Sequence, residues 1–227
     1  MFNLEWDKLE ERKYTTGVDH VVLFLQAEDG SYPEAEAWSG VTQIVENPSG
    51  GEPTPQYADN IKYFNMISAE ELGATIECFY YPDGFKKCNG IVDPVQGMSF
   101  GQQARANFAL AYRTKIGNAV KNNAYGYQIR ILYGCSATPT DRTAATINES
   151  VEAPTMSFTL STLPVTINTK KADGTEYSPT SVVVFDSTIM TAEQMEKVEN
   201  ILYGSNDTKG RLPLPDEFLE LLADVEG

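Results

Sequence analysis

Histidine and cysteine are scarce in this chain of 227 residues, which holds one histidine and three cysteines. A Ser–His–Asp or Cys–His site would have to use His20. Its place directly before the apolar run 21–25 instead predicts a structural role at the start of a strand. One histidine excludes the paired-histidine zinc motif, and the spacing of Cys78, Cys88 and Cys135 fits no zinc pair. No glycine-rich phosphate-binding motif is present. We therefore expect no enzyme activity, no metal and no cofactor, with thiols buried as small apolar groups.

Basic residues are also few, because 17 Lys and Arg stand against 32 Asp and Glu and give a net charge of −15. This balance argues against a protein that grips nucleic acid, since phosphate binding depends on Lys and Arg. It also argues against docking on anionic lipid. Residues 1–60 carry −9, residues 61–190 carry zero and residues 191–227 carry −6. The acidic ends either serve solubility or form a surface that contacts or repels a charged partner.

No apolar run approaches the roughly 20 residues that a membrane-spanning helix needs. The longest candidate, VVLFL at 21–25, is far shorter. The charged start of the chain has no apolar core of the kind found in secretory signals. We therefore expect synthesis in the cytoplasm and no membrane partner.

Alternation with period two dominates the chain. Phe108, Leu110 and Tyr112 alternate with small alanines, and similar patterns recur along the middle of the sequence. Large residues on every second position indicate strands with one face toward a core. The sequence predicts a mainly β domain, with two packed antiparallel sheets as a sandwich or a partly closed barrel. The expected strands cover about 18–27, 36–46, 61–67, 74–81, 105–116, 125–135, 155–163, 164–170 and 180–186.

Residues 46–60 depart from this alternation. They contain three prolines and two glycines and lack a period, which predicts a long loop. Loops of this length inside a compact domain tend to be functional. We divide the chain into an N-terminal arm at 1–17, a β domain at 18–190 and a C-terminal region at 191–227.

The C-terminal region predicts helices. Thr191 and Gln194 form a capping box that precedes an apolar stripe, and the extended LPLP at 212–215 follows. A last helix is expected, with apolar residues at i, i+3, i+4 and i+7. Its stripe consists of Phe218, Leu221, Leu222 and Val225. This helix either packs as a flanking helix on its own domain or forms an extended arm that reaches a neighbouring molecule.

Several blocks in a fixed order resemble the major tail protein (tail tube protein) of long-tailed, non-contractile bacteriophages. They are YADN at 57–60 and the segments 68–90, 100–118, 126–150, 158–167 and 212–217. The resemblance runs from about residue 5 to the end of the chain. The resemblance is most specific in the segments AYRTKIGN at 111–118 and TINES at 146–150. The chain departs from the family pattern at Ala119-Val120, Asn122-Asn123 and Cys135, which puts local turn geometry in doubt.

The resemblance implies a structural virion protein that forms stacked, usually six-membered rings. The stack is the hollow tail tube through which DNA is ejected. It implies two packed sheets with a flanking helix, and a loop at 46–60 that touches the next ring. It also implies a tape measure protein, a tail terminator and a distal tail protein as partners. The self-assembly candidates are Tyr57, Asp59, Asn60, Phe218, Leu221, Leu222 and Val225.

A tube must let DNA pass without binding it, and a negative lumen repels phosphate. Glu28, Asp29, Glu34 and Glu36 are the lumen-facing candidates, although solvation of the outer surface explains them equally well. Two other functions stay open. One is a β-sandwich binding module, such as an adhesin or a carbohydrate-binding domain, with an exposed aromatic platform. The other is a hydrolase that uses only carboxylates and needs two acids facing one cleft.

Overall fold

The structure, a computed structural model, describes residues 6–144, 146, 153–171 and 173–223. It is mainly β, and all strand pairs are antiparallel. The central sheet has the order β2-β1-β9-β10-β12. Its strands are β1 (Lys13–Leu25), β2 (Ala35–Ala37), β9 (Phe108–Asn118), β10 (Asn122–Ala137) and β12 (Val182–Asp186). The prediction of a mainly β fold with packed antiparallel sheets is confirmed.

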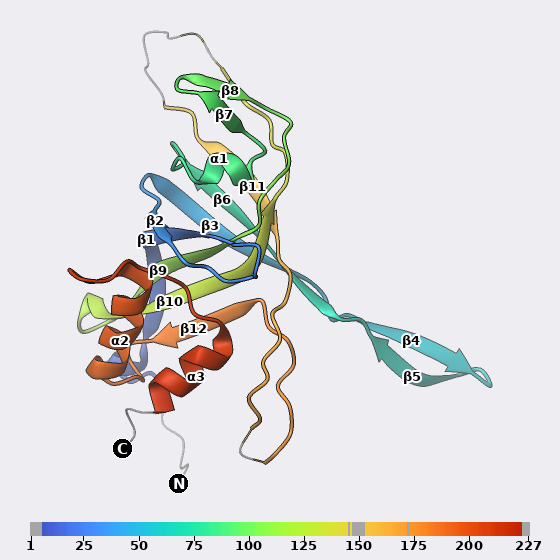
Figure 1. Ribbon diagram of the computed structural model, residues 1–227. Coiled ribbons are helices and arrows are strands. Elements are labelled where there is room, and N and C mark those ends of the chain that lie inside the picture. Colours follow the sequence, from blue (N-terminus) through green and yellow to red (C-terminus); the bar gives the residue numbers. More distant parts are fainter. Residues whose placement is uncertain (1–5, 145, 147–152, 172, 224–227) are drawn as a thin grey trace.

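A second sheet covers one face of the central sheet. It consists of β11 (Met156–Ser161), β6 (Glu70–Cys78) and β3 (Val41–Gly50). The two sheets are joined through β10, whose last residues pair with β11 at Ser136 and Ala137. Two further hairpins extend from this framework (Figure 1). They are β4 (Pro53–Ala58) with β5 (Ile61–Ile67), and β7 (Val92–Val95) with β8 (Met98–Phe100).

Helices cover the other face of the central sheet. α2 (Ala192–Tyr203) and α3 (Pro215–Ala223) lie there (Figure 1). The short α1 (Phe85–Cys88) instead adds Phe85 and Cys88 to the core cluster that the two sheets share. A 3-10 turn, η1 (Leu9–Glu11), precedes β1. α2 begins with the predicted capping box, because Gln194 N donates to Thr191 Oγ1 and Thr191 N donates to Gln194 Oε1. No helix in the described ranges is long and apolar enough to cross a bilayer.

The alternation in the strands divides the core into two clusters. Phe108, Leu110 and Tyr112 face the second sheet, where they share a cluster with buried residues of β6 and β11. Ala109 and Ala111 face the opposite way, toward α2 and α3. Small residues on that face let the helices approach the sheet closely. The central sheet is therefore buried on both faces, with strands on one side and helices on the other.

The prediction of a structureless loop at 46–60 is wrong, because most of these residues lie in β3 and β4. Among the described strands, β3 pairs with β6 alone and β4 pairs with β5 alone, so each has an edge that no described strand covers. Proline is tolerated on such edges because it need not donate to a ladder there. The prolines that interrupt the two-residue alternation in 46–60 are therefore compatible with strands.

The expected strand at 164–170 is also absent from the described residues. Only isolated bridges occur there, between Val165 and Thr180 and between Lys170 and Glu176. The N-terminal arm at 1–17 is partly strand, since β1 begins at Lys13. The TINES block at 146–150, which contributes to the family resemblance, lies outside the described residues except for Thr146.

Candidate assembly surfaces

The hairpin β4–β5 projects away from both sheets; we call residues 51–67 the arm (Figure 1). β5 has seven residues, so the ribbon is about 20–25 Å long. Gly50 and Gly51 form the bend at the base of the arm, with φ of +78° and +69°. A Cβ on Gly50 would lie 2.2 Å from the Ala69 carbonyl oxygen. Only glycine fits the bend that directs the arm outward.

The tip of the arm contains three of the predicted assembly residues. Asp59 and Asn60 form its two-residue turn, with φ of +50° and +63°. Asp and Asn adopt this left-handed conformation more readily than most residues, and the paired strands favour such a turn. Tyr57 precedes the turn and is 70% exposed. The structure therefore brings these three residues together at the most distant point of the arm.

Large apolar side chains cover the arm on both faces. Ile61, Tyr63 and Ile67 alternate with Phe64 and Met66, and all five are exposed by 51% to 71%. An isolated two-stranded hairpin is marginally stable in water. A long exposed apolar hairpin is also a template for association. The alternation in 61–67 predicted the strand, but its exposure could not be read from the sequence.

A polar cluster joins β3, which leads into the arm, to the central sheet. Glu46 of β3 accepts hydrogen bonds from Arg130 Nε at 2.8 Å, Arg130 Nη2 at 2.5 Å and Tyr112 Oη at 2.6 Å. The Glu46 side chain is 18% exposed and that of Arg130 is 28% exposed. Burial alone would raise the pKa of Glu46, but the Arg130 and Tyr112 hydrogen bonds outweigh burial and lower that pKa. Sequence reasoning missed this cluster because Glu46 lies more than 60 positions before Tyr112 and Arg130 in the chain.

The C-terminal assembly candidates pack mainly on their own domain. Phe218 is 3% exposed, and its ring centroid lies 4.9 Å from that of Phe185. Leu222 is partly buried against the same cluster, and Leu221 is half-buried. Val225 lies outside the described residues. The extended-arm interpretation of this region is therefore wrong for the described part, because α3 covers the central sheet of its own chain.

The four acidic candidates for the lumen differ in their surroundings. Asp29 accepts from Ser31 Oγ at 2.6 Å and from Ser31 N at 3.0 Å, and these bonds lower its pKa. Glu34 pairs with Lys209 at 2.9 Å, which lowers its pKa. Glu36 accepts from Gly84 N at 2.9 Å and is half-buried, whereas Glu28 is exposed. Three of these carboxylates therefore already have partners within the chain.

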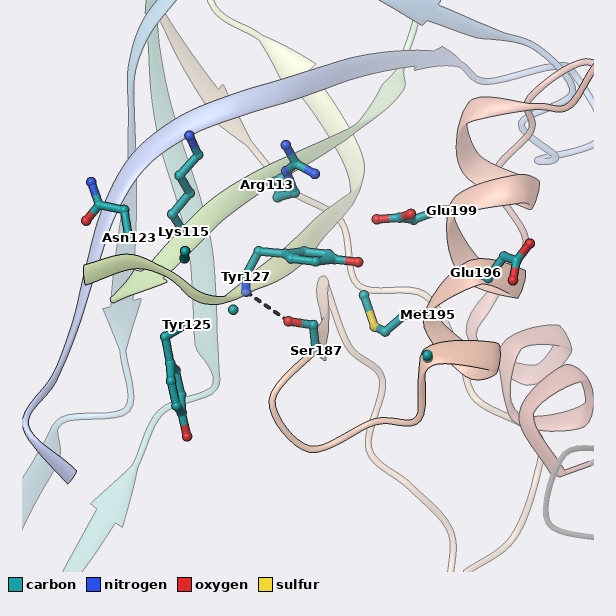
Figure 2. A pocket seen from close by; sticks show the side chains of 12 residues that line it. Arg113, Lys115, Asn123, Tyr125, Tyr127, Ser187, Met195, Glu196 and Glu199 are labelled. Atoms are coloured by element: carbon teal, nitrogen blue, oxygen red, sulfur yellow. Dashed lines mark hydrogen bonds between the residues drawn. The ribbon is translucent and has the colours of Figure 1, made fainter. Parts of the chain in front are cut away.

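A pocket of about 510 Å³ lies between the β9–β10 hairpin and α2 (Figure 2). Arg113 binds Asp19 at 2.7 Å and lies over the Tyr127 ring at 5.1 Å. Burial and the nearby Glu199 carboxylate raise the pKa of Tyr127 to about 12. Glu196 and Glu199 both come from α2, and Figure 2 shows Glu199 directed toward Tyr127 while Glu196 lies farther off. The two acids thus share one wall rather than flanking the pocket as in a glycosidase.

His20 lies within β1, not at its start, and has a φ of +49°. Its Nδ1 is 3.0 Å from Asp19 Oδ1, and its ring centroid is 5.9 Å from that of Tyr203. The Tyr203 contact ties the irregular middle of β1 to α2, whereas Asp19 is the neighbouring residue in the same strand. Among the described residues, no group of His, Cys, Asp and Glu is arranged to hold a metal ion.

Comparison with known proteins adds no identity, because neither a protein-family model nor a curated protein matches the chain. The assignment of function therefore rests on the residues and their arrangement.

Proposed function

We propose that the chain is a self-assembling structural protein, the tail tube protein of a long-tailed, non-contractile bacteriophage. The observation that carries this proposal is the arm, which has no core of its own. Its exposed apolar side chains lose contact with water only when another molecule covers them. A repeating assembly of identical subunits supplies such a molecule for every arm.

In this proposal, six subunits form a ring and the rings stack into a tube in the virion. Subunits are made in the cytoplasm of the host before they assemble. A tape measure protein sets the tube length, and a terminator and a distal tail protein close its ends. DNA passes through the lumen without specific binding, and the net charge of −15 supports a surface that repels phosphate.

Electron microscopy of the purified full-length chain tests the proposal. We expect rings or tubes once the protein is concentrated. A variant with Ile61→Ser, Tyr63→Ser and Ile67→Ser should remain a folded monomer, because these side chains are 62%, 67% and 71% exposed. A matched control with Val92→Ser and Val95→Ser in β7 should still assemble. Wild-type protein that stays monomeric at millimolar concentration would refute the proposal.

A second candidate, a carbohydrate-binding module, is favoured by one observation. Tyr80 is 64% exposed and stacks on Tyr81 with an interplanar angle of 5°. Both rings line a pocket of about 520 Å³ that also contains Asn89, Ser99 and Asp141. Aromatic faces beside amide, hydroxyl and carboxylate groups suit a sugar. Binding to a glycan array that Tyr80→Ala abolishes would support this function over the first.

A further inference from the structure

An apolar groove lies beside α3, on the side of the molecule that the helices cover. Ile167 and Tyr177 precede β12, which contributes Val183, and α3 contributes Phe218, Leu219 and Leu222. Every residue that lines it is aliphatic, aromatic or proline. Leu219 is 40% exposed and Tyr177 is 38% exposed. Water in this groove meets almost no hydrogen-bonding group, so an apolar occupant is favoured.

The size of the groove suits one aromatic ring. Its volume is about 180 Å³. An apolar cavity of about 150 Å³ is known to hold a benzene molecule. One phenyl group, rather than a peptide segment or a lipid chain, therefore matches the space.

The arm supplies such a ring in Phe64, which is 51% exposed. Phe64 shares its face of β5 with Met66, which is 58% exposed and can pack along the rim. Tyr63 is a poorer fit, because its hydroxyl would enter a groove with almost no polar partner and lose hydrogen bonds to water.

The arm and the groove of one chain cannot meet. The arm continues β3 of the second sheet, which covers one face of the central sheet. The groove lies with α3 on the opposite face (Figure 1). The central sheet stands between them, so the ring that fills a groove must come from another molecule.

We propose that Phe64 of one copy inserts into the α3 groove of the next copy. The inference rests on the proposed self-assembly and names the surface that receives the arm. Donor and acceptor are different surfaces, so each copy can give one contact and receive one. Such a heterologous contact generates rings or open-ended stacks rather than a closed pair.

The exposed area is adequate for a specific contact. Six arm side chains, namely Tyr57, Ile61, Tyr63, Phe64, Met66 and Ile67, are exposed by 51% to 71%. Aromatic side chains bury roughly 150–250 Å² each, so Tyr57, Tyr63 and Phe64 alone offer about 300–450 Å² at these exposures. A standard interface buries about 800 Å² per partner, so these rings and the three aliphatic side chains beside them supply a large part of the arm's share.

Another exposed apolar surface, the β7–β8 hairpin, is a less suitable acceptor. The β7–β8 hairpin carries Val95 and Met98, which are 64% and 51% exposed. The pocket near it is lined by polar groups, including Lys86, Asp141 and Arg142. A phenyl ring there would displace water from charged side chains, which is unfavourable.

Cysteine cross-linking between two full-length variants tests the contact. The natural cysteines are free and buried. We would mix Met66→Cys protein, which keeps the Phe64 ring, with Leu219→Cys protein, add oxidised glutathione and separate the products without reductant. A disulfide requires Cα atoms within about 7 Å, so only a close contact gives a dimer of unlike chains. The matched control replaces Leu219→Cys by Val95→Cys.

The inference predicts the dimer cross-linked between positions 66 and 219 as the main product, with at least a ten-fold lower yield for positions 66 and 95. Equal yields, a predominant dimer cross-linked between two copies of position 66, or a higher yield with position 95 would overturn it, while self-assembly would stand. A wild-type chain that forms no assembly would instead overturn the proposed function, and this inference with it.

Assembly of point variants gives a second readout. Phe64→Ala and Leu219→Ala should each raise the concentration needed for assembly at least about ten-fold, the effect of a central interface residue. Leu163→Ala, at a site 69% exposed, should leave that concentration unchanged. An unchanged threshold for both Phe64→Ala and Leu219→Ala would also overturn the inference.

Discussion

Replacing Glu46 by Gln should loosen the attachment of β3, and hence of the arm, to the central sheet. The Glu46 carboxylate accepts three hydrogen bonds of 2.5 to 2.8 Å from Arg130 and Tyr112. Gln keeps the size but removes the charge and turns an N–H₂ group toward the guanidinium. Losing a partner of a fully buried pair costs about 3–5 kcal/mol. An exposed pair contributes about 0–1 kcal/mol.

The side chains of Glu46 and Arg130 are 18% and 28% exposed, so we place the cost between these limits, at about 2 kcal/mol. For a chain of this length, that loss lowers the melting temperature by about 4–8 °C. Calorimetry of the monomer measures it. In a double-mutant cycle, Glu46→Gln with Arg130→Met should be less destabilised than the sum of the single changes. A Glu46→Gln variant within 0.5 kcal/mol of wild type would refute the reasoning.

The pH dependence gives an independent check on the same group. The folded-state pKa of Glu46 lies below its ordinary value of 4.5. A carboxyl group with a lowered pKa contributes stability that is fully present above the unfolded pKa and is lost as the pH falls through the folded pKa. The difference in melting temperature between wild type and Glu46→Gln should therefore shrink below about pH 4.5. A difference that stays constant down to pH 2 would exclude the charge as its cause.

Three further predictions concern the core, the arm tip and the thiols. Leu202→Ala should lower the free energy of unfolding, measured in urea, by about 2–5 kcal/mol, because Leu202 of α2 is 0% exposed against the sheet. A loss below 1 kcal/mol would contradict that packing. Asn60→Val should destabilise the turn by about 1–2 kcal/mol and speed amide exchange in β5, because Asn60 has a φ of +63°. Asn60→Gly should not have this effect. Equal exchange rates in the two variants would exclude the left-handed turn. Burial raises the pKa of Cys78 to about 11 and that of Cys88 to about 12, so a thiol reagent at pH 8 should label them only after denaturation; rapid labelling of native protein would contradict their burial.

The sequence predicts best where a residue's environment is set by its own chain. Alternation in 105–116 predicts β9, and the capping box predicts the start of α2 at Ala192. In both cases, neighbouring residues in the sequence decide which face is buried. The large residues of β9 and its alanines proved to face different layers, which alternation alone does not reveal.

The sequence predicts least where distant segments decide the outcome. Residues 46–60 look irregular because of their prolines, yet pairing with β6 and β5 makes them strands. The 164–170 segment alternates like a strand but finds only isolated bridges. The Glu46 cluster combines residues more than 60 positions apart. Such contacts depend on topology, which local periodicity does not contain.

The structure changes the role that the C-terminal region can have in the proposed assembly contact. The C-terminal region, expected either to pack on its own domain or to reach a neighbour as an arm, covers its own core through Leu212 and Phe218. Tyr133 Oη in that core donates to the Pro213 carbonyl oxygen at 2.8 Å. Deleting residues 204–227 would therefore unfold this face. A loss of assembly in that variant would not show whether the region forms an assembly contact. The exposed Leu219 separates the two effects, because its substitution alters the groove while leaving the buried contacts of α3 in place.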